Sequence, residues 1–351
     1  MSLVAVAHYP EGSGHATRML AVARELERRG ATVRLAGGGP GATFARLNGY
    51  EEFEPTRVDY IGDYQGGGSL VHVFRNSVPD SGRRVRDYVG WLRDLDPAAL
   101  VTDDMFAAVA AHVAGVPLYV LTHNAPFLYE GRVERAATLL WTVYQRGIAR
   151  EFLYPAVWPQ VPGDPRGPTR IPPVALAEYP GEGSTDDGGG PARGDDGRAG
   201  NDGGPTGNDG DPTDGDPAVD PGVLVVPSHY STDPNALADR VREAGHRVTL
   251  VGDEDWEPLP SLLPAIRAAD AVVCSGYSTV MEAAVAGTPC VMVPRTDEQR
   301  GVGRVLSATA TEGVAVVGDA DGVAAALADP PTASPRENGA ERAAERILAS
   351  L

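Results

Sequence analysis

One stretch, residues 271–305, limits what this 351-residue chain can fold into more than any other. It opens with an apolar run at residues 271–274 that ends in a turn of small residues. A helical pattern follows and stops at Gly287, and a second apolar run begins at Cys290. A buried strand, a tight turn, a helix and a second buried strand form the repeating unit of parallel sheets. We therefore expect an α/β fold.

Small and hydroxyl-bearing residues line the turn of this unit. Ser275 and Gly276 form the turn, and Ser278 and Thr279 open the helix. The free backbone N–H groups of a helix start, with the positive end of its dipole, favour an anionic group, above all a phosphate. Glu282 would repel a phosphate, so we expect it to accept hydrogen bonds from sugar hydroxyls. An ordinary β-α-β unit in which serine only caps the helix explains the same residues equally well.

The charge of the chain narrows the classes of partner. It has 48 acidic and 30 basic residues and a formal net charge of −18, and all its basic residues are arginine. This pattern favours a protein adapted to high salt, of the halophilic archaeal type, although a GC-rich genome would also replace lysine with arginine. An acidic chain without a basic patch does not fit generic nucleic-acid binding, and no nucleic-acid partner is expected.

Membrane and redox signals favour a cytoplasmic location. The chain opens directly into a strand pattern without a signal peptide, and no apolar run reaches the length of a membrane span. Cys274 and Cys290 lie in apolar strand patterns and are expected to be small core residues, not a disulfide or a metal pair. No His/Cys/Asp cluster has the spacing of a zinc site, so no metal is expected.

The pattern of elements predicts two domains and a linker. Residues 1–160 alternate strands with helices, as in a doubly wound parallel sheet, and end in a long helix at 131–154. A connector is expected at 161–179. Residues 180–222 are almost entirely Gly, Asp, Pro, Thr, Asn and Ala, a composition that predicts a disordered acidic linker. Residues 223–351 form the second α/β domain, which ends in an amphipathic helix.

A glycine-rich turn after the first strand carries a second candidate site. It reads Gly12-Ser13-Gly14-His15. As a dinucleotide-binding fingerprint it is weak, because Thr17 occupies the third glycine position and the second strand lacks the acidic residue that holds a ribose. A phosphate loop of the Walker type is excluded because the chain has no lysine. A purely structural turn, with His15 at a helix start, remains open.

The spacing of residues in the second domain resembles the donor-site signature of GT-B glycosyltransferases. The similarity is greatest to family 28, which includes the N-acetylglucosaminyltransferase that forms lipid II. It rests on Ser275-Gly276-x-x-Thr279-Val280-x-Glu282, Gly287-x-Pro289, Pro294 and Glu298-Gln299. This resemblance implies two Rossmann-like domains that face each other across a cleft. It also implies an inverting, metal-independent transfer of a hexosyl or N-acetylhexosaminyl group from a UDP-sugar, with no cofactor.

The resemblance also implies roles for the donor-site residues. Ser275, Gly276, Ser278 and Thr279 would hold the diphosphate, Glu282 the ribose, and Glu298 with Gln299 the sugar hydroxyls. The chain departs from the family pattern after Gln299, where Gly301-Val-Gly303-Arg304 replaces the usual Asn-Ala. Arg300 or Arg304 would then be alternative phosphate contacts.

The first turn, Gly12-x-Gly14-His15-x-x-Arg18, is similar to the first loop of family 28 and family 1 transferases. The resemblance implies that His15 is the general base and that Asp104 orients it, with Asp103 as the fallback and His123 as an alternative base. A carboxylate partner would fix the tautomer of the imidazole and stabilise its charged form. Gly14, His123 and Asn124 would lie on the acceptor side.

The acceptor is not named by the sequence. The resemblance implies an acceptor hydroxyl, lipid-linked in some relatives, and a peripheral contact at the inner face of the membrane, although the sequence shows no basic amphipathic patch. Two alternatives share the expected fold. They are a UDP-sugar 2-epimerase, which would need further acid/base residues in the cleft, and a non-catalytic subunit that binds nucleotide sugars.

Overall fold

The computed structural model describes residues 2–58, 70–177, 222–227, 234–254 and 256–351. Of the predicted acidic linker, only residue 222 is among them, so that prediction lies outside the described residues. The described residues of both predicted domains belong to one compact unit.

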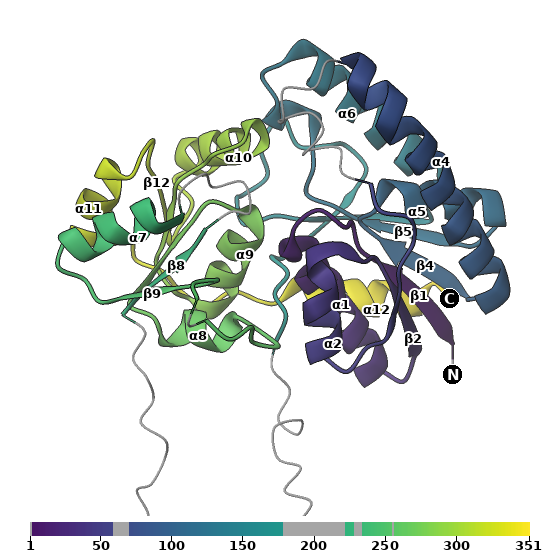
Figure 1. Ribbon diagram of the computed structural model, residues 1–351, viewed down its shortest axis with the longest axis horizontal. Coiled ribbons are helices and arrows are strands. Elements are labelled where there is room, and N and C mark those ends of the chain that lie inside the picture. The colour runs from purple at the N-terminus through teal and green to yellow at the C-terminus, as the bar shows by residue number, and fades with distance from the viewer. Residues whose placement is uncertain (1, 59–69, 178–221, 228–233, 255) are drawn as a thin grey trace, which may run out of the picture. The chain divides into compact units, whose positions relative to one another are not determined.

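The first domain is built on a seven-stranded sheet in which every neighbouring pair is parallel. Its strands are mostly buried and apolar, because helices cover both faces of such a sheet (Figure 1). In spatial order they are β3 (Glu52–Phe53), β2 (Thr32–Ala36), β1 (Leu3–Ala7), β4 (Ala99–Thr102), β5 (Leu118–Leu121), β6 (Glu151–Pro155) and β7 (Thr169–Ile171).

Helix α5 (Met105–Ala114) of this domain begins and ends at residues that cap it. Asp104 accepts from the backbone N–H of Phe106 to start α5, and Gly115 ends that helix in the left-handed region with φ 77°. The others are α1 (Ser13–Arg28), η1 (Gly39–Gly41), α2 (Ala42–Leu47), α4 (Leu70–Leu95), η2 (Pro126–Leu128) and α6 (Arg132–Ile148).

The long helix predicted at 131–154 is wrong in its second part. Helix α6 stops at Ile148, and Ala149 is extended with ψ 141°. The residues that follow are the buried, aromatic-rich strand β6, which pairs with β5 and β7. These residues form a strand because burying their aromatic and apolar side chains in the sheet stabilises the fold more than continuing the helix would. Strand β7 lies in the expected connector and extends the first sheet.

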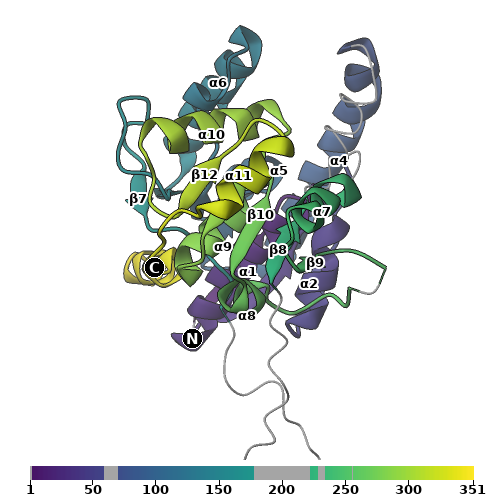
Figure 2. The same cartoon turned by 90° about the vertical axis from the view of Figure 1, so that its left-hand side faces the viewer.

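The second domain has five parallel strands in the order β12-β11-β10-β8-β9. Strand β10 is central, and its end leads directly to the turn at Gly276 (Figure 2). The strands are β8 (Val223–Val226), β9 (Val248–Leu250), β10 (Ala271–Cys274), β11 (Cys290–Met292) and β12 (Val314–Val316). The helices are α7 (Pro234–Glu243), α8 (Leu263–Ala268), α9 (Tyr277–Ala286), α10 (Asp297–Ala308) and α11 (Asp321–Ala328).

The last helix, α12 (Gly339–Ala349), packs on the first domain beside α1 (Figure 1). Ala340, Ala343, Ala344 and Ile347 are fully or almost fully buried and belong to the same apolar cluster as β1 and α1. The helix starts at Asn338, whose side chain accepts from the N–H of Ala340. The core of the first sheet is therefore completed by residues from the far end of the chain.

Both cysteines are buried free thiols whose Sγ atoms lie 3.6 Å apart. They pack in the core of the second sheet as small apolar residues, as predicted. Among the described residues, no helix is long and apolar enough to cross a membrane.

We predict that Ile347→Ala destabilises the protein by about 2–5 kcal/mol, because it opens a cavity in the core of the first sheet. Urea unfolding followed by circular dichroism measures the loss. Arg342→Ala, on the exposed face of the same helix, removes only a surface ion pair and should cost less than about 1 kcal/mol. Equal effects of the two substitutions would contradict the packing described for α12.

Candidate functional site

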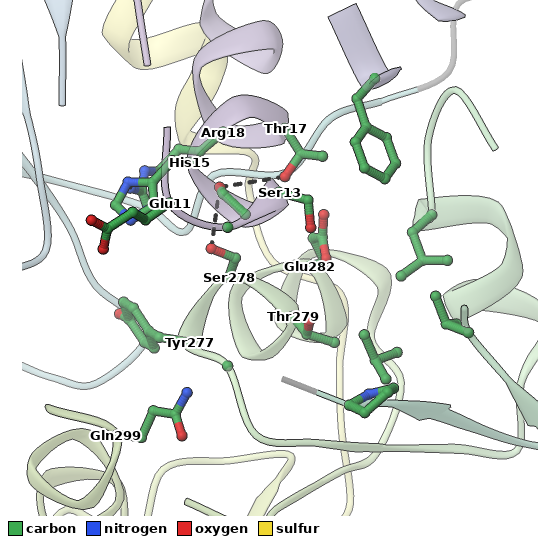
Figure 3. A pocket seen from close by; sticks show the side chains of 18 of the residues that line it. Glu11, Ser13, His15, Thr17, Arg18, Tyr277, Ser278, Thr279, Glu282 and Gln299 are labelled. Carbon is green, nitrogen blue, oxygen red and sulfur yellow. Dashed lines mark hydrogen bonds between the residues drawn. The ribbon is translucent and has the colours of Figure 1, made fainter. Parts of the chain in front are cut away.

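The first turns of α1 and α9 meet at the predicted donor loop. Helix α1 starts after Gly12 and α9 after Gly276, and no side chain among the described residues caps either start. The hydroxyl of Ser278 donates to the carbonyl oxygen of Gly14 across 3.3 Å (Figure 3). A Cβ at Gly14 would lie 2.4 Å from Ser278 Oγ. Glycine at this position therefore permits the close approach of the two helices.

A pocket of about 250 Å³ lies at this meeting point. Neither first turn contains an acidic residue, so the backbone N–H groups of both helix starts favour an anion there. The carboxylates of Glu11, Glu282 and Glu298 also line the pocket, so an anion would be held by backbone N–H groups more than by side-chain charge. The lining includes Ser13, Gly14, His15, Thr17 and Arg18 from α1, and Tyr277, Ser278, Thr279 and Glu282 from α9 (Figure 3).

Two predicted donor residues lie deeper than expected. Ser275 is fully buried and does not line the pocket, and among the described residues its Oγ has no hydrogen-bond partner. Glu282 lines the pocket but is only 6% exposed. Burial raises the pKa of Glu282 to about 7, and the nearby charge of Arg18 opposes this shift.

The carboxylate that contacts His15 is Asp103, not Asp104. Nδ1 of His15 lies 2.8 Å from Oδ2 of Asp103, whose other oxygen accepts from the backbone N–H of Tyr9 at 2.9 Å. Burial of Asp103 would raise its pKa, but the charges and hydrogen bonds of His15 and Arg18 hold that pKa well below its usual range. His15 itself is partly open, with 33% of its side chain exposed.

Asp104 points to the other side of the sheet and is fully buried. Its Oδ2 accepts from Arg84 Nη2 at 2.7 Å and from Tyr88 Oη at 2.9 Å, while Oδ1 caps α5. The expectation that Asp104 orients His15 is therefore corrected. Neighbouring residues at a strand end project to opposite faces, so a shift of one position exchanges the two roles.

Arg18 is a site residue to which the sequence pattern assigned no role. Its side chain is 1% exposed, and Nη2 donates to Asp103 Oδ2 at 2.5 Å. It follows His15 by three positions on α1, and residues at this spacing lie on one face of a helix. The spacing in Gly-His-x-x-Arg was the sequence signal that could have placed Arg18 beside His15.

The two domains also meet at His123, which follows β5 and contacts Glu298 of helix α10. Its Nε2 lies 2.7 Å from Oε1 of Glu298, and burial lowers the pKa of His123. Gln299, predicted to bind sugar hydroxyls, lines the pocket, but its Oε1 accepts from the N–H groups of Arg295 and Thr296 in a capping box. Its side-chain oxygen is thus committed to starting α10.

The two arginines considered as phosphate contacts point elsewhere. Arg300 contacts Asp297 and the carbonyl of Arg295, and Arg304 contacts Glu130 and the carbonyl of Leu128. Neither is among the residues that line the pocket. They support the structure around α10.

A second pocket, of about 240 Å³, lies on another side of His15. The predicted acceptor-side residue Asn124 lines it, and Asn124 Oδ1 is buried with no hydrogen-bond partner among the described residues. His15, His123 and Glu298 line both pockets. The remaining lining is largely aromatic and polar, and includes Tyr9, Asp103, Met105, Tyr129, Trp141 and Gln145. Within the described ranges, no group of three or more His, Cys, Asp or Glu could hold a metal ion.

Comparison with known proteins identifies the fold. No family model matches the chain, and no curated protein matches it in sequence. Among solved structures, the kitacinnamycin glycotransferase is similar with a TM-score of 0.62 at 16% identity, over 100% of this chain and 99% of that one. SsfS6, a glycosyltransferase of Streptomyces sp. SF2575 complexed with thymidine diphosphate, has a TM-score of 0.57 at 14% identity, over 100% of both chains.

MurG of Acinetobacter baumannii is similar with a TM-score of 0.54 at 13% identity, over 99% of both chains. These neighbours and the two parallel sheets confirm the predicted fold class. The chain has the α/β fold of GT-B glycosyltransferases, with two Rossmann-like sheets.

We predict that Glu282→Gln changes the pH dependence of stability. Because the folded-state pKa is raised from 4.5 to about 7, the neutral carboxyl stabilises the fold below pH 4.5, and this contribution is lost as the pH rises through 7. At pH 8 the substitution should therefore raise the free energy of unfolding by up to about 3 kcal/mol, with little change at pH 4.5. Urea unfolding at both pH values measures this. The exposed Glu337→Gln is the control, and a pH-independent effect of Glu282→Gln would contradict the assignment.

Proposed function

We propose that this protein is a glycosyltransferase that moves a sugar from a nucleoside diphosphate donor to an acceptor hydroxyl. One observation carries the proposal. A partly open histidine, held by a buried carboxylate, lines two pockets at once, and one of these contains the starts of two uncapped helices. A base placed between a site for a diphosphate and a site for an acceptor is what such a transfer requires.

The proposed mechanism is a single displacement with inversion. Nδ1–H of His15 donates to Asp103, which leaves Nε2 free to take the proton of the acceptor hydroxyl. The acceptor oxygen forms a bond to the anomeric carbon while the bond from that carbon to the diphosphate breaks. The departing diphosphate is stabilised by the N–H groups at the start of α9 and by the hydroxyl of Thr279.

The finer assignments are part of the proposal. The transferred group is a hexosyl or N-acetylhexosaminyl group, and the donor is a UDP-sugar of the kind used by family 28. Glu282 binds the ribose and Glu298 a sugar hydroxyl. SsfS6 and the spinosyn rhamnosyltransferase SpnG form complexes with thymidine diphosphate, so TDP-sugars are the next donors to test. A cytoplasmic location and adaptation to high salt also remain proposals.

The proposal predicts that wild-type protein releases UDP or TDP from its donor in the presence of an acceptor hydroxyl, in high-salt buffer. His15→Ala should lower kcat by about 10²–10⁴-fold because the general base is lost, with little change in the Kd for nucleoside diphosphate. Asp103→Asn should lower kcat too, because it no longer selects the His15 tautomer. Released nucleotide, measured across a panel of donors and acceptors, gives kcat, and calorimetry gives the Kd.

His112→Ala is the matched control, because His112 lies at the end of α5 and lines neither pocket. Full activity of His15→Ala would contradict the role of His15. Tight nucleotide binding without turnover on any donor would favour the non-catalytic subunit. Conversion of the donor to its 2-epimer would favour the epimerase.

A peripheral membrane contact is also part of the proposal. The sequence shows no basic amphipathic patch, but α6 has an exposed apolar stripe in which Val133 is 76%, Leu140 72% and Val143 57% exposed. Arg132 and Arg146 are exposed on the same helix, which lies at the margin of the structure in both views (Figures 1 and 2). Basic residues beside an apolar stripe favour an anionic lipid surface.

We predict that the protein floats with vesicles containing anionic phosphatidylglycerol. Leu140→Glu should weaken this binding at least about tenfold, because a buried apolar contact becomes a like charge facing the lipid. Leu47→Glu, a change at an exposed leucine of α2, should leave flotation unchanged. Equal binding of both variants, or no binding by the wild type, would rule out α6 as the contact.

A further inference from the structure

Arg18 joins two groups of the first domain, Asp103 and His123, and His123 in turn contacts the second domain. Its Nη2 donates to Oδ2 of Asp103 at 2.5 Å, and its Nη1 lies 3.2 Å from Nδ1 of His123. The opposite nitrogen of His123 lies 2.7 Å from Glu298, the first-turn carboxylate of α10 in the second domain. Because Oδ2 of Asp103 also contacts His15, an unbroken chain of hydrogen bonds runs from Glu298 to His15.

The chemistry of arginine assigns the protons along this chain. A guanidinium only donates, so Nδ1 of His123 accepts from Arg18. A neutral imidazole has one N–H, so His123 carries its proton on Nε2 and donates it to Glu298. Arg18 therefore selects the tautomer of His123 that can reach across to the second domain.

At His15 the two neighbours of Nδ1 favour opposite tautomers, because the guanidinium of Arg18 can only donate to Nδ1 and the carboxylate of Asp103 can only accept from it. Nδ1 of His15 and Nη2 of Arg18 lie 3.0 Å apart and share one acceptor, Oδ2 of Asp103. When Nδ1 carries the proton, both groups donate to that oxygen and Nε2 of His15 is free. Without Arg18, Oδ2 would be bound by His15 alone, and nothing else among the described hydrogen bonds would connect Asp103 to His123.

We infer that Arg18 is a positioning residue that couples Glu298, on the donor side, to the His15–Asp103 pair. It acts through Asp103 and His123. A change at Glu298, such as a new hydrogen bond to a donor sugar, alters the acceptor of His123 and hence the position of the guanidinium beside His15. The catalytic role of this coupling rests on the proposed function, but the coupling itself is a property of the protein without substrate.

The coupling is tested by nitrogen NMR of full-length protein labelled at histidine, without ligand. In the wild type, His123 should be protonated at Nε2 only, and Glu298→Ala should shift the ring signals of His15. In Arg18→Met, which keeps a long side chain but no donor, His123 should lose its single tautomer. Adding Glu298→Ala to Arg18→Met should then leave the His15 signals unchanged. The signal of His112 is an internal reference, because it lies outside the network.

The result that overturns the inference is a His15 response to Glu298→Ala that is the same with and without Arg18. Arg18→Lys is a second test of the coupling, which can be used if Arg18→Met does not fold. Lysine keeps the buried charge, but its single ammonium cannot reproduce the planar fork that spans Asp103 and His123. The coupling should therefore fall in this variant as well, and an unchanged coupling would also overturn the inference.

Kinetics give a second readout if the wild type turns over. Arg18→Met should lower kcat by about 10–100-fold, as expected for a misplaced base, with the Kd for nucleoside diphosphate within about twofold of wild type. A large rise in that Kd at unchanged kcat would instead make Arg18 a donor ligand and overturn the positioning role. If the wild type has no transferase activity, the proposed function fails, while the NMR measurement still decides the coupling.

Discussion

The candidate site depends on the hydrogen bonds that the buried carboxylate of Asp103 accepts. It sits just beyond the end of β4, where it accepts from the backbone of Tyr9, from His15 and from Arg18. A buried charge is tolerated only when it is paired and hydrogen-bonded, and these three donors satisfy that condition. They also tie the end of β4 to the loop after β1 and to the first turn of α1. The position of His15 between two pockets follows from this one cluster.

The parallel sheets carry this cluster because strands β1, β4 and β5 are neighbours. Their carboxyl ends lie at one edge, so Tyr9, Asp103 and His123 come together although they are far apart in the chain. The second sheet repeats the arrangement, with the end of β10 leading into α9. The edge of the second sheet thus supplies a helix start that favours an anion, and the edge of the first sheet supplies a histidine with a carboxylate partner.

Much of this fold could be predicted from the sequence, because buried parallel strands and amphipathic helices have strong, distinct patterns. The turns at Gly276 and before His15 were placed at strand ends for the same reason, whereas the roles expected of them rest on the resemblance to glycosyltransferases. Strand β6 was missed because residues 151–155 continue a helical pattern and only burial in the sheet makes them a strand. The choice between Asp103 and Asp104 depends on which face each side chain takes, and two adjacent aspartates carry no information about that.

A side chain that can fill two roles cannot be assigned to one of them from the sequence alone. Gln299 could bind a sugar or cap a helix, and the structure shows that it caps α10. Arg18 could not be assigned a role because its partners come from strand ends that only the folded sheet brings near it.

The placement of α12 has a consequence for how the protein is made. Residues 340–347 fill the core of the first sheet, but they are translated only after the second domain, because they follow it in the chain. The first sheet therefore emerges early with an apolar surface that stays uncovered while the whole second domain is synthesised. Domains generally fold as units during synthesis, and exposed apolar surface is prone to aggregation until it is buried. For this chain, the N-terminal domain reaches its final stability only after the C-terminal one has been translated.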